Sequence, residues 1–75
     1  MLLNAVIEKD ESGYFASVPT LKGCVSHGKT YEEALENIKE ATELYLESLQ
    51  QEEISRLQNT ISMIAPIEVV LRRHG

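Results

Sequence analysis

The sequence has few aromatic, basic or sulfur-containing residues, and each shortage argues against a class of site. It has no Trp, and aromatic residues make up 5% of the chain, so few rings are available to stack on single-stranded nucleic acid. Lys and Arg number 7 against 12 Asp and Glu, and the net charge of −5 opposes sequence-independent attraction to phosphates. A basic protein partner suits this balance better.

Disulfide and membrane signals are also missing. Cys24 is the single cysteine, so no disulfide can form within the chain, which is consistent with a reducing compartment. No apolar run approaches the roughly 20 residues of a membrane-spanning helix. Segment 1–7 is apolar but too short for a secretory signal, and charged residues follow it at once. We therefore expect a soluble, cytoplasmic protein.

The length of the chain bounds its stability. We expect residues 1–75 to form a single domain, and a chain of this size buries only about 60% of the surface that it exposes when unfolded. One small core contributes roughly 3–5 kcal/mol, with no disulfide or metal cluster to add to it. Association with another chain, as a dimer or higher homo-oligomer, is the expected source of further stability.

Two apolar segments near the start, 2–7 and 14–18, alternate with a period of two, as β-strands do. The polar residues 9–13 between them end in Gly13, which predicts a hairpin loop and antiparallel pairing. One face of the two strands is apolar and is expected to face the core; it carries Leu3, Ala5, Ile7, Tyr14, Ala16 and Val18.

Residues 19–30 are rich in groups that end strands and turn the chain. Pro19 lacks an N–H and restricts the residue before it to extended backbone, so the second strand is expected to end there. Leu21 is expected to turn inward. Gly23 permits another turn, and residues 24–27 predict a short third strand. We interpret this stretch as a structural connector.

A helix start is predicted at residues 30–33. Thr30 and Glu33 match a capping box, in which the Thr30 hydroxyl accepts from the Glu33 N–H and the Glu33 carboxylate accepts from the Thr30 N–H. Apolar residues then recur every three or four positions and form one stripe. The stripe consists of Ala34, Leu35, Ile38, Ala41, Thr42, Tyr45, Leu46 and Leu49.

Beyond Leu49 the helical period weakens and then resumes at Ile54 and Leu57, which predicts a continued or second short helix. Residues 67–71 alternate again and predict a final strand, with Ile67, Val69 and Leu71 on its core face. The predicted fold is therefore α+β: a two-layer sandwich of order β-β-β-α-β, with an antiparallel three-stranded sheet, a helix and a returning strand.

Two surfaces are candidate interfaces. The sheet face without a helix is more apolar than a solvated face should be, and is expected to contact a partner or a second copy through Leu2, Val6, Phe15 and Val70. The acidic side of the helix is the candidate contact for a basic partner, through Glu36, Glu40, Glu43 and Glu47.

Catalytic and metal sites have weaker support. The acidic residues that could gather for a two-metal nuclease have simpler interpretations as solvated loop or outward strand residues; they are Glu8, Asp10, Glu11 and Glu68. Cys24, His27 and His74 are too few for a usual zinc site, and the first two should point to opposite sheet faces. We expect Cys24 to be buried, and expect no catalytic residue, metal or cofactor.

Residues 6–41 resemble the HicB-like antitoxin family, and the similarity extends from about Leu3 to Leu49. Three motifs carry it together: Gly-Tyr-Phe-Ala-Ser-Val-Pro at 13–19, Leu-Lys-Gly-Cys at 21–24 and Thr-Tyr-Glu-Glu-Ala-Leu at 30–35. The resemblance implies a degenerate, partial ribonuclease H-like fold with a returning strand. It also implies a non-enzymatic antitoxin that binds and masks a basic HicA toxin, an mRNA-cleaving ribonuclease.

Many family members add a C-terminal DNA-binding module, for which too few residues follow Leu49 in this chain. We therefore expect no such module and no direct DNA binding. Two alternatives remain open: a stand-alone oligomeric adaptor or regulator without a toxin partner, and a minimal metal-dependent nuclease. The number of copies in an oligomer and the toxin-contacting residues are open too.

Overall fold

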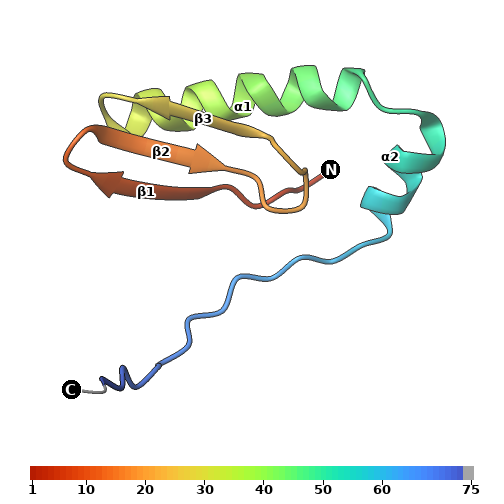
Figure 1. The fold of residues 1–75 in the computed structure, drawn as a ribbon. Coiled ribbons are helices and arrows are strands. Elements are labelled where there is room, and N and C mark those ends of the chain that lie inside the picture. Colours follow the sequence, from red (N-terminus) through yellow and green to blue (C-terminus); the bar gives the residue numbers. More distant parts are fainter. Residues whose placement is uncertain (74–75) are drawn as a thin grey trace.

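The computed structural model describes residues 1–73 and has an α+β fold, as predicted. Its strands are β1 (Val6–Asp10), β2 (Gly13–Ser17) and β3 (Val25–Gly28), and its helices are α1 (Tyr31–Glu47) and α2 (Gln51–Gln58). The strands form one antiparallel sheet in the order β1-β2-β3, and α1 packs along β3 and β2 (Figure 1). The predicted three-stranded sheet covered by a helix is confirmed.

The first hairpin is tighter than its polar sequence suggests. Asp10 pairs with Gly13, which leaves only residues 11 and 12 in the turn, and the Ser12 N–H donates to the Asp10 Oδ1 over 2.8 Å. Gly13 has φ +135°, and a Cβ there would lie 2.9 Å from the Gly28 carbonyl oxygen. Strand β1 thus continues to Asp10 rather than ending at Ile7, because an exposed strand tolerates charged side chains while its backbone stays paired.

The connector between β2 and β3 is closed by its own backbone. The Val18 N–H donates to the Cys24 carbonyl over 3.0 Å, and the Leu21 N–H donates to the Val18 carbonyl over 2.9 Å. Leu21 is 3% exposed, which confirms its inward position. The Tyr45 hydroxyl, from α1, donates to the Lys22 carbonyl over 2.9 Å. These bonds confirm the interpretation of this stretch as a structural connector.

The core lies between the sheet, this connector and α1. Its buried members come from all three: Ala16, Val18, Leu21, Cys24, Ala34 and Ile38. Leu3, Ile7, Tyr14 and Tyr45 pack against them, as predicted. Ala5 is exposed because it precedes the paired part of β1, and Leu35 is 43% exposed because it follows Ala34 by one helical position and turns away from the sheet.

The two helices are capped in related ways. The Thr30 hydroxyl accepts from the Glu33 N–H over 3.1 Å, as predicted, but the Glu33 Oε1 accepts from the Lys29 N–H and not from that of Thr30. Helix α2 is separate from α1, and the Glu53 Oε1 accepts from the Gln50 N–H over 3.0 Å at its start. A second short helix is therefore confirmed. Neither helix of the described residues is long and apolar enough to cross a membrane.

The returning strand is the predicted element that the structure does not contain. After α2 the chain forms neither helix nor strand from residue 60 to residue 73, and it runs clear of the sheet (Figure 1). Ile67, Val69 and Leu71 are therefore not core residues; they are 82%, 73% and 78% exposed. Alternation favours extended backbone, but a strand also needs a hydrogen-bonded neighbour, and this segment has none within the described residues of one copy.

Candidate protein-binding surfaces

The sheet face turned away from α1 is defined by strand register. Because Ala16 is buried against the helix, its neighbours Phe15 and Ser17 point to the opposite face. Phe15 pairs with Glu8 on one side and His27 on the other, so these three side chains form one row across the sheet. Phe15 is 44% exposed. The face is accessible and mixes an aromatic ring with charged and polar groups.

A second row on this face consists of Val6, Ser17 and Val25. Val6 is partly buried, and Val25 is 50% exposed beside the Phe15–His27 pair. The predicted interface residues Val6 and Phe15 thus lie on the same face of neighbouring strands. Sequence reasoning missed Val25 and His27 as members of it, although their alternation with inward Cys24 indicates their direction.

The other two residues predicted for this face lie elsewhere. Leu2 precedes β1 and is 94% exposed, and Val70 lies in the segment after α2, away from the sheet. In a single copy Val70 therefore does not join the apolar sheet face, because the returning strand that should carry it is not formed. Its role as an interface residue stays a prediction.

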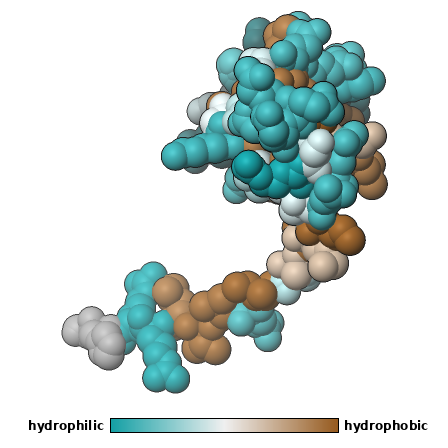
Figure 2. All heavy atoms as spheres, turned by 90° about the vertical axis from the view of Figure 1, so that its right-hand side faces the viewer, coloured by the Kyte–Doolittle hydropathy of each residue, from teal (hydrophilic) through white to brown (hydrophobic). Residues whose placement is uncertain are grey.

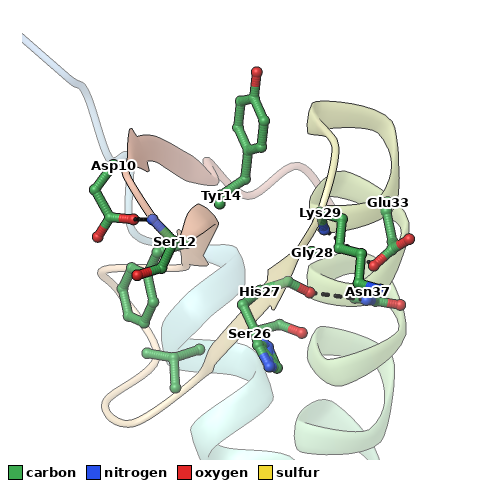
Figure 3. Close-up of a pocket in the computed structure, with 12 residues that line it drawn as sticks. Asp10, Ser12, Tyr14, Ser26, His27, Gly28, Lys29, Glu33 and Asn37 are labelled. Carbon is green, nitrogen blue, oxygen red and sulfur yellow. Dashed lines mark hydrogen bonds between the residues drawn. The ribbon is translucent and has the colours of Figure 1, made fainter.

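An open hollow of about 800 Å³ lies at the β1–β2 turn end of the sheet (Figure 3). Its walls include the turn, β2, β3 and the first turns of α1. Two of its polar groups already have partners: the Asn37 Nδ2 donates to the His27 carbonyl over 2.9 Å, and Glu33 accepts from the Lys29 N–H over 3.1 Å (Figure 3). These bonds tie β3 to α1, so the polar wall has a structural role.

The acidic residues of α1 form the second surface. Glu36, Glu40, Glu43 and Glu47 are all exposed, and their spacing of four, three and four residues keeps them on one side of the helix. Helix α1 holds six Glu and a single Lys, whereas the rest of the chain has six acidic and six basic residues. The whole net charge of −5 therefore belongs to this helix.

The residues considered for catalysis or metal binding do not gather. No group of three or more His, Cys, Asp and Glu able to hold a metal ion occurs among residues 1–73. The Asp10 carboxylate accepts from the Ser12 N–H within the hairpin turn. Cys24 is buried, with its Sγ 3.6 Å from the Thr42 Oγ1, while His27 is exposed, as their opposite directions predict. His74, the third candidate ligand, lies outside the described residues.

Comparison with known proteins identifies the family of this chain. Residues 3–70 match the family described as the HicB-like antitoxin of bacterial toxin-antitoxin systems, so the match extends through α2 and most of the segment after it. A UPF0150 protein of Helicobacter pylori strain J99 is 68% identical over 69 residues, which cover 92% of this chain and 96% of that protein.

Proteins of other organisms are similar over shorter stretches. A UPF0150 protein of Synechocystis is 58% identical over 45 residues, covering 59% of this chain and 57% of that protein. A UPF0150 protein of Thermoplasma acidophilum is 54% identical over 50 residues, covering 65% of this chain and 72% of that protein. No solved structure matched. Because the family model covers residues 3–70 and the Helicobacter pylori relative matches 92% of this chain, the chain belongs to the HicB-like antitoxin family.

Proposed function

We propose that this protein is a non-enzymatic antitoxin that binds and masks a HicA-type toxin, a small basic ribonuclease that cleaves mRNA. Family membership supports an antitoxin role in general. The concentration of the net charge on α1 is the observation that supports a basic partner in particular. Because mRNA is cleaved in the cytoplasm, we place the complex there, and the free thiol of Cys24 is compatible with that location.

The acidic stripe of α1 is suited to a basic protein surface. Glu36, Glu40, Glu43 and Glu47 are exposed on one side of a rigid helix, so their charges have fixed relative positions. The last turn of α1 contains no basic residue to offset Glu47 or the negative end of the helix dipole. Complementary potentials of this kind speed encounter and select partners.

The test is co-expression with a HicA-type toxin, followed by pull-down and by rescue from toxin-induced growth arrest. Glu40→Lys is expected to weaken the complex at least roughly tenfold, because a like charge placed against a basic surface costs several kcal/mol. The matched control is Glu52→Lys, which makes the same change in net charge at an exposed position of α2.

If the toxin contacts the acidic stripe of α1, Glu40→Lys must weaken the complex more than Glu52→Lys does. Equal weakening by Glu40→Lys and Glu52→Lys would mean that only total charge matters, and the assignment to α1 would fail. A wild-type protein that neither retains the toxin nor restores growth would overturn the proposed function itself.

A further inference from the structure

We propose that the C-terminal arm, residues 61–73, pairs as an added strand with β1 of a second copy of this chain, and that two copies exchange arms. The arm leaves a long run of large apolar side chains in water: Ile61, Met63, Ile64, Ile67, Val69, Val70 and Leu71, each at least 60% exposed. Figure 2 shows this apolar run along the segment that leaves the body of the molecule. Contiguous exposed apolar surface of this kind is typical of an interface.

The composition of the arm favours a strand as the form in which it is covered. Residues 67–71 are Ile, Glu, Val, Val and Leu, a run rich in β-branched side chains that suit a pleated surface. Their backbone forms no helix, strand or turn in a single copy. What they lack is an edge to pair with.

Of the two edges of the sheet, β1 is the free one. Beside β3 lies α1: the Asn37 Nδ2 donates to the His27 carbonyl, and a Cβ on Gly28 would lie 2.5 Å from the Ala34 backbone nitrogen. Strand β1 pairs with β2 on one side and with no other strand of the described residues. An uncovered edge of this kind accepts an added strand.

Within one chain, the arm is badly aligned with β1. The Asn4 Nδ2 donates to the Ser62 carbonyl over 2.8 Å, so the arm passes the start of β1 and runs on in the same general direction (Figure 1). Counted from that contact, β1 would face residues 64–68. Pro66 is at the centre of that stretch and has no N–H for the ladder, and most of the alternating run 67–71 would extend past the end of β1.

A second copy removes this mismatch. Residues 67–71 equal β1 in length, five residues each, and a parallel alignment of the two places Val69 opposite Glu8. The same alignment brings Arg72 beside Glu11, next to Asp10, and so sets opposite charges together. Reciprocal exchange uses both free edges and both arms in a closed two-fold dimer.

Cross-linking between full-length chains tests the exchange. A tagged Glu8→Cys chain is mixed with an untagged Val69→Cys chain and treated with a flexible bismaleimide, which tolerates a small error in register. The expected product is a covalent heterodimer. Glu40→Cys mixed with Val69→Cys is the matched control and is expected to give none, and Glu8→Cys mixed with wild type measures any background from buried Cys24.

The double variant Glu8→Cys/Val69→Cys separates exchange from pairing within one chain. Predominant links between chains support the proposal, whereas predominant links within a chain overturn it, as does a heterodimer yield no higher than the Glu40→Cys control. Because no toxin is present, these outcomes are independent of the proposed function.

Sedimentation provides the second measurement. Wild type is expected to be dimeric and Ile67→Asp/Val69→Asp monomeric, with the same circular dichroism, since both side chains are exposed in a single copy and support no core. Ile67→Thr/Val69→Thr, which keeps β-branched side chains, is expected to remain largely dimeric. A monomeric wild type, or a dimer unchanged by the Asp pair, would contradict the exchange.

Discussion

At the scale of single residues, the core depends on a few side chains that meet from different parts of the chain. Ile38 is 2% exposed and is the largest fully buried side chain, and it shares the core with small residues such as Ala16 and Ala34. Gly28 is equally constrained, because any side chain there would meet the backbone of α1. With neighbours this small and close, the core has little capacity to rearrange around a lost group.

Truncating Ile38 should therefore be costly. Ile38→Ala is expected to lower the free energy of unfolding by about 2–5 kcal/mol, from lost burial and the cavity that remains. Leu44→Ala, in the same helix at 61% exposure, should change it by no more than about 0.5 kcal/mol. Urea unfolding measures both, and Ile38→Val, expected to cost about 0.5–1.5 kcal/mol, covers the case in which the Ala variant does not fold. Equal losses in Ile38→Ala and Leu44→Ala would show that the core lies elsewhere.

At the scale of elements, helix starts and turns are held by local side-chain contacts. The Thr30 hydroxyl accepts from the Glu33 N–H, while the Glu33 Oε1 accepts from the N–H of Lys29. Lys29 lies between the end of β3 and the start of α1. The cap thus also secures the chain where it passes from sheet to helix. Helix α1 is the element that both completes the core and presents the acidic stripe, so its stability matters to both.

Removal of this cap should weaken the fold measurably. Thr30→Ala is expected to reduce stability by about 0.5–2 kcal/mol, and Thr30→Ser to restore most of it, because the hydroxyl acceptor returns. Thr60→Ala is the comparison: its hydroxyl donates to the Arg56 carbonyl at the exposed end of α2, and its loss should cost under about 0.5 kcal/mol. Thermal unfolding gives the ranking, and a Thr30→Ser variant no better than Thr30→Ala would rule out the hydroxyl as the cause.

At the scale of the whole molecule, a small core is combined with an apolar arm that the single copy leaves in water. Among residues 1–73, six hydrophobic side chains are buried, while seven large hydrophobics of the arm are exposed. A chain with this distribution gains more from association than from any adjustment within one copy. Exchange of arms and binding of a basic toxin use different surfaces, the β1 edge and α1, so the two can coexist.

Stability should consequently depend on protein concentration. The melting temperature of the full chain is expected to rise with concentration, because dimer formation binds the native state and follows mass action. Ile67→Asp/Val69→Asp should melt at a temperature that does not change with concentration. Differential scanning fluorimetry over a dilution series measures this, and a concentration-independent wild type would argue against a stabilising dimer.

Most of the fold could be predicted from local sequence patterns, because the elements concerned are held by contacts between neighbouring residues. The hairpin, the inward Leu21, the capped start of α1 and the short α2 each depend on residues close together in sequence. The errors came where a competing partner was available: Glu33 accepts from Lys29 rather than Thr30, and the returning strand found no neighbour. Of the candidate surfaces, the Glu stripe followed from helical spacing, whereas the place of Val25 and His27 in the outer row required the β2–β3 register.

What the sequence by itself determined is the set of elements, their order, the acidic helix and the alternating apolar run at 67–71. Tertiary structure decided which edges are covered and which residues share a face. Helix α1 covers the β3 side and leaves β1 open, and the arm passes Asn4 in a register that does not suit its own strand. Periodicity specifies how a segment can pair, but the pairing itself depends on a second backbone at the right distance and register, and that is a property of the folded chain and its neighbours.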